Sequence, residues 1–185
     1  LIFRTDLPLC AEDTQALSRL SFAYALFQLS REASDASLIP VNLSFSAFVP
    51  DKISSLLKYS GKTNELFTRL MINTACAVSD FSFQDRLSLL DPLAGKGTTL
   101  FEGLSFGFDV FGIEQSKKVT EEAVVFLKKF LETERMKHTI CTETMHPGKG
   151  TDAHRTTFQI AKNKREQKDG QVRLCSLVSG DAKDT

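Results

Sequence analysis

Residues 87–114 constrain the fold of this chain most strongly, because two apolar runs flank a glycine-rich turn. The first run, residues 87–91, predicts a buried strand that ends in an aspartate. A turn containing Gly95 and Gly97 follows, and the residues after it predict a helix. The second run, residues 108–114, predicts another strand and ends in a glutamate. Strands that alternate with helices indicate parallel pairing with right-handed crossovers.

The two acidic residues, Asp91 and Glu114, end these strands, and ligands of such sheets bind at the carboxyl ends of the strands. Glycines let the backbone approach a ligand closely, and an acid at the second strand end accepts hydrogen bonds from ribose hydroxyls. The three-glycine pattern of dinucleotide sites is not met. Asp91 would repel a pyrophosphate but attract an ammonium group. The pattern therefore favours S-adenosylmethionine, which carries an ammonium group and a ribose but no phosphate.

Residues 91–99 read Asp-Pro-Leu-Ala-Gly-Lys-Gly-Thr-Thr. This segment resembles the cofactor loop of S-adenosylmethionine-dependent methyltransferases that modify amino groups of RNA or DNA bases, which reads Asp-Pro-Phe-x-Gly-x-Gly-Thr or -Ser. The resemblance implies that Asp91 binds the cofactor ammonium and that Glu114 holds the ribose. It further implies loop contacts with the cofactor from Pro92, Ala94, Gly95, Gly97 and Thr98.

Two flanking segments extend the resemblance. Residues 61–75 look like the helix that precedes the first strand in tRNA guanine-N2 methyltransferases of the THUMP-related type, which implies that Thr63 and Asn73 lie near the methionine end. A helix-end hydrogen bond is an equally good interpretation of Asn73. Residues 172–178 alternate as a strand and lead to Asp181 in a Gly-Asp pair, which resembles the third methyltransferase motif. There the carboxylate would meet the adenine amino group, although Gly-Asp is also a common turn.

We therefore expect an α/β, Rossmann-like methyltransferase fold with a parallel-dominated sheet. Residues 61–185 would form the N-terminal half of the cofactor-binding domain, with a basic insert at about 138–170, and residues 1–60 a helical or mixed extension. The family's Asp/Asn-Pro-Pro-aromatic motif, which holds the target amino group, does not occur in the sequence. Together with the first residue being Leu1, this predicts that the fold is incomplete in this chain, and no residue is assigned as catalytic.

A coarse reading of the remaining chain predicts a helix over 12–30, a loop over 31–40 and a short strand over 41–48 followed by a helix after Pro50. A long amphipathic helix is expected at about 116–137. In the basic insert, the pattern is compatible with a hairpin of two strands, and the spans expected for these two strands are 156–161 and 172–178.

The insert region 135–173 contains nine Lys or Arg and four Asp or Glu, although the whole chain has no net charge. Such a local excess of positive charge would suit a phosphate backbone, and it is also typical of a solvated hairpin. We therefore consider RNA a partner of this segment. The side chains expected to contact it are those of Lys162, Lys164, Arg165 and Lys168.

Composition favours a cytoplasmic protein. No apolar run is long enough to span a membrane, and nothing at the start reads as a signal peptide. The four cysteines are widely spaced, as in reduced intracellular proteins. No metal is expected, because the residue types that suit zinc follow none of its common spacings: His138, Cys141, His146, His154 and Cys175.

Three alternatives stay open. A P-loop is disfavoured because position 90 is Leu instead of glycine and Gly97 follows the lysine. A non-catalytic methyltransferase-like subunit would keep the fold and support a partner. A methyltransferase for a small molecule or a protein would share the same cofactor half, but the Asp-Pro opening favours methylation of an exocyclic base amino group, in RNA before DNA.

Overall fold

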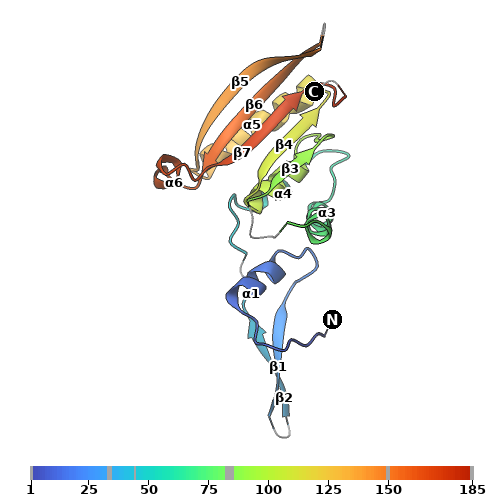
Figure 1. The fold of residues 1–185 in the computed structure, drawn as a ribbon, viewed down its shortest axis with the longest axis vertical. Helices are drawn as coiled ribbons and strands as arrows, with labels where there is room; N and C mark the ends of the chain where they lie inside the picture. The colour runs from blue at the N-terminus through green and yellow to red at the C-terminus, as the bar shows by residue number, and fades with distance from the viewer. Residues whose placement is uncertain (1, 33–34, 44, 82–85, 149–150, 184–185) are drawn as a thin grey trace.

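The computed structural model is an α/β structure with a five-stranded mixed sheet and a separate two-stranded sheet (Figure 1). The strand order of the larger sheet is β3-β4-β7-β6-β5. The structure describes residues 2–32, 35–43, 45–81, 86–148 and 151–183.

Three parallel strands form the part of the sheet that carries the candidate site. β3 (Ser88–Asp91) pairs in parallel with β4 (Asp109–Glu114), which pairs in parallel with β7 (Arg173–Ser179). Helix α4 (Thr98–Ser105) connects β3 to β4, and α5 (Lys117–Thr133) follows β4. The positions of the two strands and the helix predicted from residues 87–114 are confirmed, as is the long helix after Glu114, which ends four residues earlier than expected. The expected burial of the first strand is wrong, because β3 lies at the edge of the sheet and Leu90 is 60% exposed.

The basic insert forms an antiparallel extension of this sheet. β5 (Lys137–Gly148) pairs with β6 (Thr151–Ala161), and β6 pairs with β7 after the short helix α6 (Lys164–Lys168). The expected hairpin is confirmed by the second pairing, but β5 was not predicted. Because a short connection returns each of these strands in the opposite direction, two of the four pairings are antiparallel. The sheet is therefore mixed, and the expected dominance of parallel strands is not confirmed.

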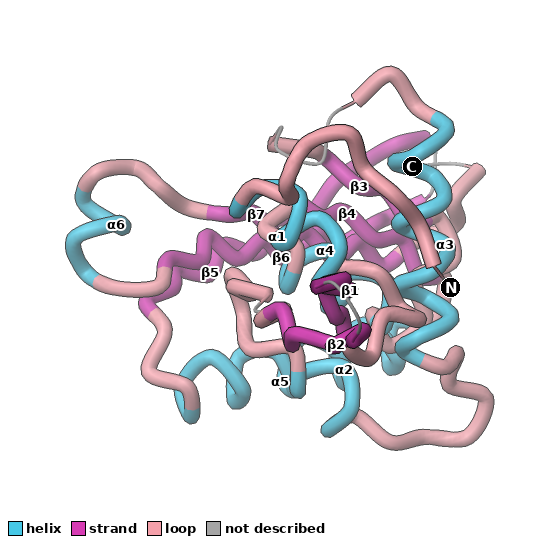
Figure 2. The backbone as a smooth tube through the Cα atoms, turned by 90° about the horizontal axis from the view of Figure 1, so that it is seen from below, coloured by secondary structure: helices cyan, strands magenta, loops and turns pink. Residues whose placement is uncertain are grey.

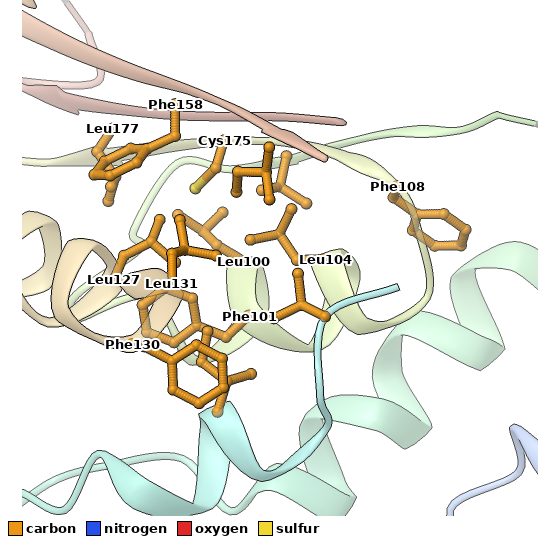
Figure 3. Close-up of a cluster of buried hydrophobic side chains, with 14 of the residues drawn as sticks. Leu100, Phe101, Leu104, Phe108, Leu127, Phe130, Leu131, Phe158, Cys175 and Leu177 are labelled. Carbon is orange, nitrogen blue, oxygen red and sulfur yellow. The ribbon is translucent and has the colours of Figure 1, made fainter. Parts of the chain in front are cut away.

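Helices α4 and α5 cover one face of the sheet, and the core lies between these helices and the strands (Figure 3). Seen along the long axis of the molecule, α5 lies to one side of the sheet strands (Figure 2). The register places Val110, Cys175 and Phe158 side by side on this face, and all three are fully buried. Helix α5 meets them with buried side chains at helical spacing: Ala123, Leu127, Phe130 and Leu131.

Two glycines set the close approach of α4 to the strands. A Cβ atom on Gly112 of β4 would lie 2.6 Å from Leu100 Cδ1 and 2.8 Å from Ala94 Cβ. A Cβ atom on Gly103 of α4 would lie 2.8 Å from Val110 Cγ1. Any larger residue would push the helix, and with it the preceding loop, away from β4.

The N-terminal residues fold differently from the expectation. Helix α1 (Ala11–Ser18) ends twelve residues before the expected helix end, and β1 (Leu26–Glu32) and β2 (Asp35–Val41) form an antiparallel hairpin. For the described residues, the predicted helix over 19–30, the loop over 31–40 and the strand over 41–48 are therefore wrong; residues 33, 34 and 44 of these spans lie outside the described part of the chain. From Phe27 onward apolar and polar residues alternate, as in Phe27 and Leu29, and this alternation is the period of a strand. The sequence-based prediction assigned these residues to a helical period instead.

Helices α2 (Lys52–Leu56) and α3 (Glu65–Val78) agree with the expected helices after Pro50 and before β3. Asn64 caps α3, because its side chain accepts hydrogen bonds from two backbone N–H groups of the first turn. Val49 and Ile53 have no exposed surface and belong to the main core. The packing of the core thus includes residues on both sides of the expected domain boundary at residue 60.

Candidate functional site

The loop after β3 is folded onto the end of β4. Asp91, the last residue of β3, is half-buried, and its Oδ1 accepts a hydrogen bond from the Leu93 backbone N–H at 3.0 Å. The Ala94 N–H donates to the Ile113 carbonyl at 2.9 Å. Pro92 and Leu93 form a turn at the edge of the sheet, where Pro92 is exposed and Ala94 is buried. These bonds hold the loop in place.

Both loop glycines have backbone conformations that favour glycine. Gly95 has a φ of 54° and Gly97 a φ of 92°, and Gly97 is the N-cap of α4. No atom lies within 4 Å of the position that a Cβ on Gly95 would take, so this side of the loop is open. Thr98, the first residue of α4, is buried. The half-buried Gly95 therefore lies, with open space on one side, two residues before the N-cap of α4.

Glu114 at the end of β4 joins the loop to the start of α5. Its Oε2 accepts a hydrogen bond from the Gly95 N–H at 3.1 Å, and its Oε1 accepts one from the Ser116 N–H at 2.8 Å. Ser116 in turn caps α5, since its hydroxyl accepts from the Val119 N–H. One carboxylate thus fixes both the glycine turn and the following helix.

Asp181 lies at the same edge because β7 ends beside β4. Glu114 pairs with Ser179, and the Gly180 N–H donates to the Glu114 carbonyl at 3.0 Å. The Asp181 Oδ1 accepts from the Lys183 N–H at 3.0 Å. Parallel strands end at the same edge of a sheet. Asp91 and Glu114 are the last residues of β3 and β4, and Asp181 follows the end of the neighbouring strand β7. Such a set of carboxylates attracts a cation and disfavours a phosphate.

The other two expected site residues lie outside the loop. Thr63 is exposed in the connection before α3. Asn73 is buried in α3, where its Nδ2 donates to the Arg19 carbonyl at 2.9 Å. Among the described residues, no hydrogen bond joins Thr63 or Asn73 to the glycine loop. A helix-end hydrogen bond is the alternative interpretation of Asn73 from the sequence, and the bond to Arg19, the C-cap of α1, is of this kind. The cofactor roles of Thr63 and Asn73 stay predictions.

Lys96 points to α5. Its Nζ lies 2.6 Å from Glu122 Oε2 and 5.0 Å from the centroid of the Tyr59 ring. The pKa of the Glu122 carboxyl is lowered, chiefly by its hydrogen bond with this lysine. The Tyr59 hydroxyl is 3.2 Å from Thr98 Oγ1. Sequence reasoning missed Tyr59 and Glu122, because only the tertiary fold brings them to the loop.

The basic residues expected to contact RNA lie at the opposite end of β7 from the candidate site. Lys164, Arg165 and Lys168 belong to α6, which precedes β7, whereas Asp181 follows it (Figure 1). Lys162 lies just before α6, and its Nζ is 5.6 Å from the centroid of the Phe48 ring. A strand of seven residues separates the two ends by about 20 Å. These side chains are not neighbours of the three carboxylates.

The cysteines and histidines do not assemble into a metal centre within the described part of the chain, where no three His, Cys, Asp or Glu side chains come together. Burial raises the pKa of the Cys175 thiol to about 12, which keeps it protonated and unreactive. No helix in the described segments has the length and apolar character needed to cross a membrane.

The sequence matches no protein-family model and no curated protein.

Proposed function

We propose that this chain binds S-adenosylmethionine at the carboxyl edge of β3, β4 and β7, as the cofactor half of a methyltransferase fold. The observation that carries the proposal is the contact of the glycine loop with Glu114, through the hydrogen bond from the Gly95 N–H to Glu114 Oε2, at the sheet edge where Asp91 and Asp181 lie at the ends of the two neighbouring strands. The open space above Gly95 is where the backbone can approach a ligand. The cofactor combines a cationic sulfonium and ammonium with a ribose, which suits this acidic edge.

Each carboxylate has a distinct role in this proposal. Asp91 uses Oδ1 to hold the turn, and its other oxygen pairs with the ammonium group. The Glu114 oxygens each accept one backbone N–H, and their remaining lone pairs accept the ribose hydroxyls. Asp181 accepts the adenine amino group. The methionine end then lies at β3 and the adenine end at β7.

The reaction we propose is methylation of an exocyclic amino group of an RNA base in the cytoplasm. The amino nitrogen attacks the methyl carbon in line, the bond from carbon to the sulfonium sulfur breaks, and the nitrogen releases one proton. S-adenosylhomocysteine and the methylated base are the products. The rate gain would come from holding donor and acceptor in near-attack geometry, with base flipping if the target is paired.

The contacts of Lys96 also support this proposal over a nucleotide-phosphate site. In a P-loop the corresponding lysine reaches the phosphates. Here the ammonium group of Lys96 is paired with Glu122 and lies against Tyr59. A phosphate at the loop would also face Asp91 and Glu114.

The first test is calorimetric titration of the 185-residue chain with S-adenosylmethionine, S-adenosylhomocysteine and, as a control, ATP. We expect micromolar binding of the first two and none of ATP. Asp91→Ala and Glu114→Ala should each weaken binding by about tenfold or more, since each removes a charge-assisted hydrogen bond. Glu132→Ala, which removes an exposed glutamate late in α5, serves as the matched control.

Unchanged affinity in both site variants would show that the site is misplaced, and binding of ATP alone would favour the phosphate-site alternative. Once cofactor binding is established, transfer of a labelled methyl group to RNA is compared with transfer to protein and to small amines. Label in the protein or the amines, but not in RNA, would refute the RNA substrate and leave the cofactor site standing.

A further inference from the structure

A cavity of about 320 Å³ lies between the first turns of α5 and the strands β5, β6 and β7. None of the three strand-end carboxylates lines it, although Ser179, which does, pairs with Glu114. The cavity is therefore next to the proposed cofactor edge but uses other side chains. Its volume falls at the lower end of the range for small-molecule sites, about 300 to 1,000 Å³. The residues that line it are Lys117, Thr120, Glu121, Val124, Val125, Thr142, His154, Thr156 and Ser179.

The sheet face below α5 changes from a large apolar side chain to polar side chains towards the carboxyl edge. Phe158 of β6 fills the space under α5 and is fully buried. The next residues of β6 on this face, towards the carboxyl edge, are Thr156 and His154, and His154 pairs with Ser179 of β7. Thr156, His154 and Ser179 line the cavity under the first turns of α5, whereas Phe158 is not among the residues that line it.

The lining is polarised along the direction of the strands. At the carboxyl edge lie Lys117, which begins α5, and the register pair His154 and Ser179. His154 Nδ1 is within hydrogen-bond distance of Thr144 Oγ1, at 3.3 Å, which orients the ring and leaves Nε2 for another partner. Two turns further along α5, Val124 forms the apolar part of the wall.

Between these two ends, the lining offers hydrogen-bonding groups of different kinds. Glu121 of α5 contributes a carboxylate, which accepts N–H groups, and lies one turn after Lys117. Thr142 and Thr156 contribute hydroxyls that are 3.2 Å apart across the strand pair. A ligand that complements all three parts carries an anion at one end, hydroxyls in the middle and a planar apolar group with N–H donors at the other.

We propose that this cavity binds one nucleotide, either free or as part of an RNA strand. The phosphate lies against the Lys117 ammonium and the His154 ring, and the ribose lies near the threonine hydroxyls. The base packs on Val124 and Val125 and donates hydrogen bonds to Glu121. The site takes a nucleotide whether or not the chain binds S-adenosylmethionine.

The test is calorimetric titration of the 185-residue chain with 5′-GMP, guanosine and inorganic phosphate, followed by a single-stranded RNA pentamer. 5′-GMP should bind more tightly than either guanosine or phosphate alone, because only the nucleotide contacts both ends of the cavity. Tighter binding of the pentamer than of 5′-GMP, lost in the same variants, identifies an RNA strand as the source; otherwise the source is a free nucleotide. Sodium octanoate is the competing probe, because it represents ligands that have an apolar body and a carboxylate but no nucleotide groups.

Variants separate this site from the rest of the surface. Lys117→Met should weaken 5′-GMP binding about tenfold, since it removes a charge-assisted contact, and Lys118→Met, at the neighbouring exposed lysine, should leave it unchanged. Thr156→Ile fills the cavity with a β-branched side chain suited to a strand and should abolish binding, while thermal unfolding checks that the variant is folded. Affinity for S-adenosylmethionine, measured in parallel, should not change.

Three results would overturn the proposal. The first is no binding of 5′-GMP or the pentamer to the unmodified chain. The second is equal loss in the Lys117→Met and Lys118→Met variants, or wild-type affinity in a folded Thr156→Ile variant. The third is binding of octanoate at least as tight as that of 5′-GMP. A failure of S-adenosylmethionine binding would count against the cofactor proposal alone.

Discussion

The α/β unit and the N-terminal hairpin segment of this chain are stabilised in different ways. In α4, seven of eight residues are buried, whereas α1 has the same length and buries none. The hairpin of β1 and β2 exposes its large side chains, among them Phe27 at 50% and Leu38 at 65%. Two-stranded hairpins are marginally stable on their own. The α/β unit is therefore held by burial, and the N-terminal segment by local pairing and a few contacts.

The largest expected difference between the two regions comes from one substitution made in each. Phe101→Ala should lower the free energy of unfolding by about 4 kcal/mol. The Phe101 side chain on α4 is fully buried in the core, and removing its ring leaves a cavity. Phe27→Ala, at a half-exposed position of β1, should cost less than about 1 kcal/mol. Chemical denaturation of both variants measures this. Equal losses would mean that the hairpin is part of the cooperative core.

The next largest effect concerns the ion pair that joins α3 to α4. Arg69 donates two hydrogen bonds to Glu102 Oε2, at 3.0 and 3.1 Å, and Glu102 is only 1% exposed. Arg69→Met should cost about 3 kcal/mol, since it leaves a buried carboxylate without its partner. Lys52→Met, which breaks an ion pair whose lysine is about half exposed, should cost less than about 1 kcal/mol. Similar costs for both variants would contradict the expectation that the buried ion pair contributes more stability than the exposed one.

The same ion pair predicts a pH dependence. Burial raises the pKa of the Glu102 carboxyl, and the charge of Arg69 opposes that rise. A carboxyl with a raised folded-state pKa contributes stability below its unfolded pKa and loses it as the pH rises through the folded value. Without Arg69 nothing opposes the rise in the pKa of Glu102, so the stability lost on Arg69→Met should grow between pH 5 and pH 8. Adding Glu102→Gln to the Arg69→Met variant should remove this pH dependence. Denaturation at the two pH values measures it, and a cost that shrinks with rising pH would contradict it.

The smallest effect concerns the attachment of the N-terminal segment to the α/β unit. The Arg19 guanidinium carbon lies 5.8 Å from the Phe45 ring centroid and 5.9 Å from that of Phe106. Arg19→Ala should cost about 1 kcal/mol. Limited proteolysis should then cut residues 20–25 faster than in the unmodified chain, while cutting within the α/β unit stays the same. Faster cutting in both regions would show that the segment stabilises the whole protein.

The contrast between the regions also explains which parts of the fold the sequence predicted. Residues 87–114 were assigned correctly because strand period, glycine turn and helix start agree there, and each is a local signal. Residues 19–41 were misassigned because scattered apolar residues fit a helical face as well as a strand, and no burial selects between them. β5 was missed because its polar sequence acquires strand structure only by pairing with β6.

By itself, the sequence determined the strand–loop–helix–strand unit and the placement of Asp91 and Glu114 at strand ends. Only the tertiary structure decided that β7 pairs beside β4, that Lys96 turns to Glu122, and that Asn73 binds the Arg19 carbonyl. It also decided that polar side chains of β5, β6 and β7 line a cavity under α5. The physical reason is one of range. Turn chemistry and hydrophobic period act between residues close in sequence, whereas strand order, ion pairs and cavities depend on residues that only the folded chain brings together.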